Sequence, residues 1–119
     1  MYGLVKIGER EIPMQSMASV DIYFKHIFGY DPIRLQASEE FANNEGERVD
    51  LCLKMGFVMA KFVELKADRA KLNALNEDSF VEWLDTFERE DLLAATLDMW
   101  LIYNGQKKKE SKPKKSQGQ

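Results

Sequence analysis

The stretch ERVDLCLKMGFVMAKFVELKADRAKL, residues 47–72, decides the fold of this 119-residue chain because it is the longest run with helical character. Its apolar residues fall on two faces of the expected helix rather than on one. One face holds Val49, Cys52, Leu53, Gly56, Met59, Ala60 and Val63, and the other holds Leu51, Met55, Val58, Phe62 and Leu65. A helix that is apolar nearly all round lies at the centre of its domain or is shared with another subunit. The stretch therefore predicts a long helix and leaves both explanations open.

Two short apolar arms open the chain. Residues 2–7 and 11–14 flank a polar segment that begins with Gly8, which is the pattern of a β-hairpin with glycine at its turn. Pro13 cannot donate a hydrogen bond to a neighbouring strand, so we expect the second arm to form an edge. The sequence predicts an N-terminal β-hairpin.

Helical spacing continues between the hairpin and the long stretch. Residues 18–28 carry one apolar stripe, and Gly29 follows where a left-handed cap is favoured. Asp31 and Pro32 then supply an N-cap and a proline at the first helical position. A second helix is expected from Pro32 to about Asn43.

A short helix is expected near Asn76, where two start signals compete. Asn76 could cap it, with Leu75 and Phe80 as a hydrophobic staple, or Ser79 and Glu82 could form a capping box. Both choices leave the start of the helix open by a few residues. Both place the same apolar residues on its inner face, namely Phe80, Trp83, Leu84 and Phe87.

A last helix is expected to start within residues 88–91 and to continue through residues 92–104, which contain a single charged residue, Asp98. The acidic residues within 88–91 suit its first turn, where the helix dipole favours negative charge. Together these segments predict a mainly α domain of about five helices, with the N-terminal hairpin, over residues 1–105.

The composition changes sharply after Gly105. Residues 1–105 hold 11 Lys plus Arg and 19 Asp plus Glu, a net charge of -8, whereas residues 106–119 hold six Lys and one Glu, a net charge of +5. The second segment has no large apolar side chain whose burial could offset the entropy cost of ordering it. We expect residues 106–119 to form a disordered, lysine-rich tail.

Few residues offer chemistry. His26 is the one histidine and Cys52 the one cysteine, so neither a disulfide nor a multi-cysteine metal site is expected. We expect His26 on the surface and Cys52 as a small buried apolar residue. The carboxylates fall at helix starts and solvated faces, and the glycines form no phosphate-binding loop. The sequence predicts no enzyme, no cofactor and no metal.

The longest apolar stretch is interrupted by Lys54, Lys61 and Glu64, so we expect no membrane span and a soluble intracellular protein. A chain with surplus apolar helical surface and no evident chemistry is expected to bind protein. The residues that we expect at an interface are Met55, Met59, Phe62 and Trp100, whereas Phe24, Phe28, Trp83 and Phe87 are expected in the core.

An alternative function is a small regulatory protein that binds nucleic acid. The lysine-rich tail could contact phosphates, or the first two helices could form a helix-turn-helix around Gly29 and Pro32. The acidic body opposes this interpretation, as does the second helix, where only Arg34 is available for phosphate. Nucleic acid is therefore not the expected partner.

Three segments carry a resemblance to a known family. They are VKIGEREIPM at residues 5–14, YFKHIFGYD at 23–31 and FVEWLDTF at 80–87, followed by a late helix and a lysine-rich ending. This pattern resembles the tail assembly chaperones of long-tailed bacteriophages and prophages of Gram-positive hosts. The likeness covers most of residues 4–109.

The resemblance implies a small helical protein of the host bacterial cytoplasm that is absent from the mature virion. Such proteins coat the tape measure protein and are displaced as tail tube subunits polymerise, and they self-associate. In many of these phages a ribosomal frameshift near the end of the gene yields a longer product that recruits tail tube protein. Lys107, Lys108 and Lys109 could be encoded by a slippery adenine run.

Overall fold

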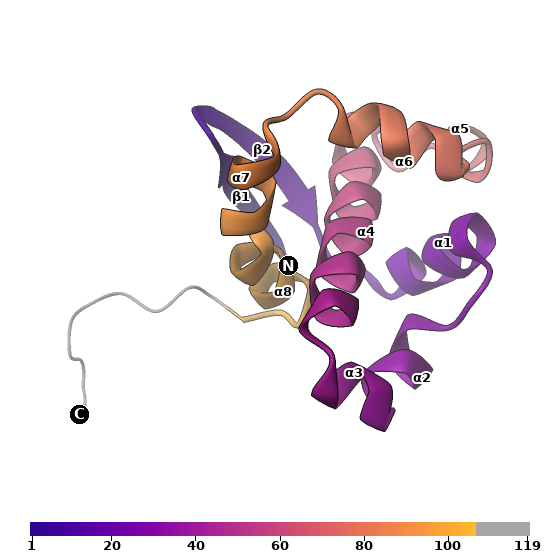
Figure 1. Cartoon of the computed structure of the whole chain (residues 1–119). Coiled ribbons are helices and arrows are strands. Elements are labelled where there is room, and N and C mark those ends of the chain that lie inside the picture. Colours follow the sequence, from indigo (N-terminus) through magenta and orange to yellow (C-terminus); the bar gives the residue numbers. More distant parts are fainter. Residues whose placement is uncertain (107–119) are drawn as a thin grey trace, which may run out of the picture.

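The computed structural model of this chain describes residues 1–106, which form a hairpin and eight helices (Figure 1). The mainly α fold with an N-terminal β-hairpin is confirmed, but the expected number of about five helices is wrong. The predicted disordered tail lies, from residue 107 onward, outside the described residues. The elements are β1 (Tyr2–Ile7), β2 (Arg10–Gln15), α1 (Ala18–Phe28), α2 (Pro32–Gln36), α3 (Glu39–Asn43), α4 (Glu45–Glu64), α5 (Arg69–Asn73), α6 (Glu77–Leu84), α7 (Arg89–Ala94) and α8 (Thr96–Tyr103).

The hairpin is a two-stranded antiparallel sheet in which Ile7 pairs with Arg10 across a two-residue loop. Gly8 has a φ of 66°, which glycine adopts without the steric cost that other residues incur. Val5, Ile7 and Met14 point to the buried face of the sheet, because side chains alternate along each strand. Only one face of the hairpin is therefore covered.

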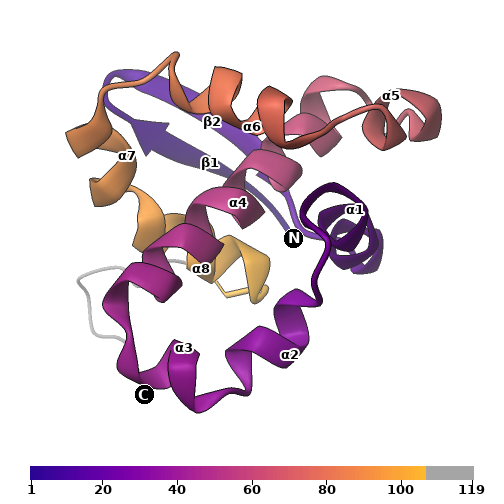
Figure 2. The same cartoon turned by 45° about the vertical axis from the view of Figure 1, so that its right-hand side comes forward.

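The long helix α4 lies at the centre of the fold. It contacts β2, α8, α1, α3 and α6, and the hairpin lies on one side of it with α1 on the other in both views (Figures 1 and 2). Residues from both of its apolar faces are buried, including Leu51 and Val58 on one and Cys52 and Ala60 on the other. A central position explains its two apolar faces without a second subunit.

Gly56 lets α4 and α8 approach closely. A Cβ atom built at this position would lie 2.5 Å from the Sδ atom of Met99, whose side chain is fully buried. Even an alanine would force Met99 to move within a packed core. The glycine therefore serves helix packing.

The prediction that one helix runs from 47 to 72 is wrong at its end, because α4 stops at Glu64. Lys66 and Ala67 have left-handed φ values of 54° and 58°, and the Ala67 amide donates to the Phe62 carbonyl at 2.9 Å. The Asp68 side chain then caps α5 by accepting a hydrogen bond from the Lys71 amide. The capping residue Asp68 therefore starts a new helix within the stretch whose apolar pattern predicted a single one.

The helix expected over 32–43 also divides, into α2 and α3. Asp31 caps α2 as predicted, but the Ser38 hydroxyl accepts a hydrogen bond from the Phe41 amide and starts α3. The five residues of α2 span about 7.5 Å, which is short for a recognition helix in a DNA groove.

The structure also decides where α6 begins and how the last predicted helix is divided. Asn76 is the cap of α6, and its partner in the capping box is Ser79, so the signal at Asn76 is right and the one at Ser79 and Glu82 is wrong. The last helix starts within 88–91 as expected but divides at Ala95, whose amide donates to the Leu92 carbonyl at 3.1 Å. The turn at Ala95 allows α7 to contact β1 while α8 packs on α4.

Tyr103 holds several segments around the end of α8. Its hydroxyl donates to the Asp21 carboxylate at 2.7 Å and accepts from the Gln36 amide at 3.2 Å. Its carbonyl accepts a hydrogen bond from the Ser16 hydroxyl at 2.8 Å. The helices α1 and α2 and the end of the hairpin therefore meet at one residue. Within residues 1–106, none of the helices has the length and apolar character needed to cross a membrane.

Candidate functional site

The four residues predicted at an interface lie in different environments. Met55 and Met59 are 0% exposed, so neither can contact a partner in this fold. Both belong to the buried core, to which α4, the hairpin and α8 contribute, and we therefore reassign them from the interface to the core. Phe62 and Trp100 are half-buried and pack against that core.

Phe62 and Trp100 do not form one site. Phe62 lies near the end of α4, about 15 Å along the helix axis from Cys52, the α4 residue beside Trp100. Of the residues expected in the core, Phe24 and Trp83 are buried, whereas Phe28 and Phe87 are half-buried against it. Trp100 is thus the predicted interface residue that the structure places at a surface hollow.

That hollow, which we name the Trp100 groove, lies between α3, the first half of α4 and α8. Its volume is about 350 Å³. The indole of Trp100 stacks on the ring of Phe41, with 5.8 Å between ring centroids and 27° between planes. Leu97, one helical turn before Trp100, is 64% exposed. The residues that line the groove are Phe41, Glu45, Arg48, Val49, Cys52, Thr96, Leu97 and Trp100.

The groove has an apolar floor and a polar rim. Burial raises the pKa of the Cys52 thiol to about 11, so this side chain stays neutral at physiological pH. On the rim, the Arg48 guanidinium donates to the carbonyls of Phe41 and Ala42, at 3.1 and 2.8 Å. These bonds fix α3 to α4, so one wall of the groove is held in place.

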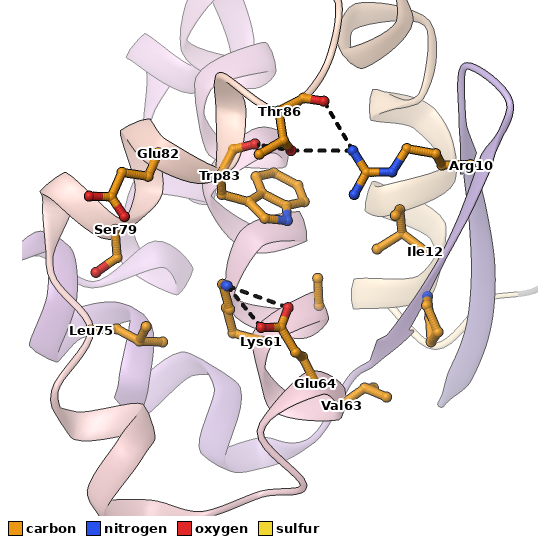
Figure 3. Close-up of a pocket in the computed structure, with 12 residues that line it drawn as sticks. Arg10, Ile12, Lys61, Val63, Glu64, Leu75, Ser79, Glu82, Trp83 and Thr86 are labelled. Atoms are coloured by element: carbon orange, nitrogen blue, oxygen red, sulfur yellow. Dashed lines mark hydrogen bonds and ion pairs between the residues drawn. The ribbon is translucent and has the colours of Figure 1, made fainter.

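A second hollow, which we name the Trp83 cleft, lies between β2, the second half of α4 and α6 (Figure 3). Its volume is about 690 Å³. Apolar side chains and several charged groups face it from the three elements. The residues that line it are Arg10, Ile12, Pro13, Ala60, Lys61, Val63, Glu64, Leu75, Ser79, Glu82, Trp83 and Thr86.

Arg10 joins the two sides of this cleft. Its guanidinium donates to the Thr86 carbonyl at 3.0 Å and to the Thr86 hydroxyl at 3.3 Å, and its carbon lies 4.2 Å from the centre of the Phe87 ring. Lys61 and Glu64 form an ion pair at 3.2 Å on α4 (Figure 3). The cleft therefore has a fixed end at the hairpin and a neutralised pair on its α4 side.

His26 and Cys52, the residues best suited to catalysis or metal binding, lie where they support the fold. His26 is exposed, as expected, and its Nε2 donates to the Asn73 carbonyl at 3.1 Å, which links α1 to α5. Cys52 is buried, as expected. In the described part of the chain, no group of three or more His, Cys, Asp or Glu residues could hold a metal ion.

Sequence reasoning missed both the partners of Trp100 and the whole Trp83 cleft. Leu97 stands three residues before Trp100 in a nearly all-apolar helix, and that spacing was the available signal. Phe41 gives no such signal, because its contact with Trp100 joins segments far apart in the chain. No known protein family, curated protein or solved structure matches this chain.

Proposed function

We propose that this protein is a non-enzymatic tail assembly chaperone that binds the tape measure protein and tail tube subunits of a phage or prophage. It acts in the host bacterial cytoplasm, associates with copies of itself and leaves before the virion matures. The proposal is supported by the resemblance of residues 5–14, 23–31 and 80–87 to that family, and by the Trp100 groove.

The Trp100 groove is the observation that carries a protein-binding function. A partly exposed tryptophan beside an exposed leucine is the kind of anchor that dominates protein interfaces. The groove runs between helices and has an apolar floor, which fits side chains from one face of an amphipathic helix. A tape measure protein, being long and helical, offers many such faces.

The test is capture of the tape measure protein of the same genome by the co-expressed chain. Leu97→Glu and Trp100→Ala should each lower the captured amount about ten-fold or more, because each removes apolar contact at the centre of the groove. Ile22→Glu is the matched control, since Ile22 is 66% exposed on α1 and does not line the groove. It should capture the partner as well as the unmodified chain does.

Circular dichroism of all three variants establishes that they are folded. Unchanged capture by both groove variants would contradict the proposal, and so would an equal loss in Ile22→Glu.

A further inference from the structure

Trp83 carries a polar group that has no partner among residues 1–106. The side chain is 7% exposed, yet no residue within 1–106 accepts a hydrogen bond from its indole Nε1. Buried donors are nearly always paired, because an unpaired one loses the hydrogen bonds that water would supply. Figure 3 shows the indole nitrogen pointing into the Trp83 cleft. An acceptor that enters the cleft can therefore complete this site.

The same cleft runs along the free edge of β2. Met1 and Ser16 exchange two backbone hydrogen bonds, of 2.7 and 2.8 Å. In an antiparallel pair of strands, hydrogen-bonded and non-hydrogen-bonded residue pairs alternate. Counting from Met1 and Ser16, the pair formed by Ile7 and Arg10 is hydrogen-bonded, and the pairs that contain Glu11 and Pro13 are not. By this alternation the backbone groups of Glu11 and Pro13 point away from β1.

Two further facts describe this edge. In the described part of the chain no other group bonds to the backbone of Glu11 or Pro13. The cleft is lined both by Ile12, from the covered face of the sheet, and by Pro13, from the open face. It must therefore pass along the edge itself.

These polar groups match a peptide backbone. Glu11 offers one amide and one carbonyl, Pro13 offers a carbonyl alone, and Trp83 offers a donor from the facing wall. The edge thus offers one donor and two acceptors, and Trp83 adds a second donor, so a ligand that satisfies them carries both kinds of group, as an extended chain does. A simple anion or cation would satisfy only the donors or only the acceptors.

The charges at the rim give the ligand a direction. Arg10 bonds only to the neutral Thr86 and the Phe87 ring, and Glu82 is exposed, with no cation beside it among residues 1–106. The two lie on opposite sides of the cleft (Figure 3). A ligand with an acidic group near Arg10 and a basic group near Glu82 is complementary to both.

We propose that the Trp83 cleft binds an extended peptide segment of a partner protein, which adds as a third strand along β2 and accepts a hydrogen bond from Trp83 Nε1. Pro13 limits the pairing, since it has no amide to donate. Apolar side chains of the segment pack on Ile12, Val63 and Leu75. This site is separate from the Trp100 groove and does not depend on the identity of the partner bound there.

The experiment selects binders from a displayed library of random peptides of about eight residues against the full chain. The best binder is then synthesised and its affinity measured. Trp83→Phe keeps a ring in place but removes the donor, so it should weaken binding about five-fold or more. Trp100→Ala, in the other hollow, should leave the affinity unchanged.

A second series alters only the peptide and needs no folded variant. N-methylation at every second position should reduce binding about ten-fold or more, and methylation at the positions between should have little effect, because one edge of a strand faces β2. The Trp83 indole proton should shift and exchange more slowly with water on binding. The chain has two tryptophans, so Trp83→Phe assigns this signal.

Several results would overturn the proposal. They are a library that yields no binder, an affinity insensitive to the N-methylation pattern, and a loss of binding in Trp100→Ala. Concentration-dependent dimerisation that Trp83→Phe abolishes would show that the occupant is a second copy of the chain instead.

Discussion

Cys52 and Trp83 each bring one polar hydrogen into apolar surroundings, with different consequences. A thiol is a weak donor and behaves as a small apolar side chain, so Cys52 fits its buried site on α4 without a hydrogen-bond partner among residues 1–106. An indole N–H is a full donor, and within residues 1–106 that of Trp83 has no acceptor and faces the Trp83 cleft. The first residue is structural, and the second is the basis of the proposed peptide site.

Cys52 predicts a loss of stability at alkaline pH. Burial raises the pKa of its thiol from 9.0 to about 11 in the folded chain. Its contribution to the free energy of unfolding is therefore complete below pH 9 and is lost as pH rises through 11, by about 3 kcal/mol at most. Urea unfolding at several pH values should show a steeper decline in the unmodified chain than in Cys52→Ala.

The tyrosines titrate in both chains, so the difference between the two slopes isolates the thiol. Parallel slopes would refute the assignment.

At the scale of elements, the sequence predicts best where a pattern and a terminator agree. α1 has the expected bounds because an apolar stripe ends at Gly29, whose φ of 81° suits a left-handed cap. The hairpin forms as expected for the same reason, with a glycine between two arms. Helix periodicity alone was less reliable, since the apolar pattern of residues 47–72 continues through the break after α4.

Tertiary packing explains why that pattern misleads. Leu72 is fully buried on α5, so it keeps an apolar identity although α4 has already ended. The candidate site was also beyond the sequence, because α8 is apolar on most sides and its pattern cannot tell which side stays exposed. Met55 and Trp100 both lie in helices that the sequence shows as apolar on most sides. Their exposure depends on packing by segments distant in the sequence, such as α3 and the hairpin.

The cap of α6 gives a prediction at this scale. The Asn76 side chain accepts from the Ser79 amide at 2.9 Å, and the Ser79 hydroxyl accepts from the Asn76 amide at 3.2 Å. Asn76→Ala should lower the free energy of unfolding by about 1 kcal/mol, whereas Asn76→Asp should retain most of it. Thermal unfolding followed by circular dichroism measures both.

Asn43→Ala is the matched control, because Asn43 is exposed near the end of α3 and makes no side-chain hydrogen bond among residues 1–106. A cost as large for Asn43→Ala as for Asn76→Ala would mean that capping is not the cause.

At the scale of the molecule, Tyr103 connects parts that are distant in sequence. Burial and the hydrogen bond to Asp21 raise the pKa of its hydroxyl, so it remains a donor at neutral pH. Through this group α8 holds α1, which otherwise packs mainly on α4 and α5, and α2, which otherwise packs mainly on α1 and α3.

Tyr103→Phe should therefore lower the free energy of unfolding by about 1 to 2 kcal/mol at pH 7, since it leaves Asp21 and Gln36 without this partner. Urea unfolding provides the measurement. Tyr2→Phe serves as the control, because the Tyr2 side chain is 55% exposed and its hydroxyl bonds to no other described residue. Equal stability of the two variants would rule out the connecting role of Tyr103.

The central position of α4 has a consequence for any ligand large enough to reach both hollows. The first half of α4 lines the Trp100 groove and its second half lines the Trp83 cleft. The two hollows are therefore about 15 to 20 Å apart along a single helix. A linker of about six extended residues bridges that span. A single polypeptide with a helix and a strand at that spacing would engage both ends at once, and tethering would raise the effective concentration at the second end into the millimolar range.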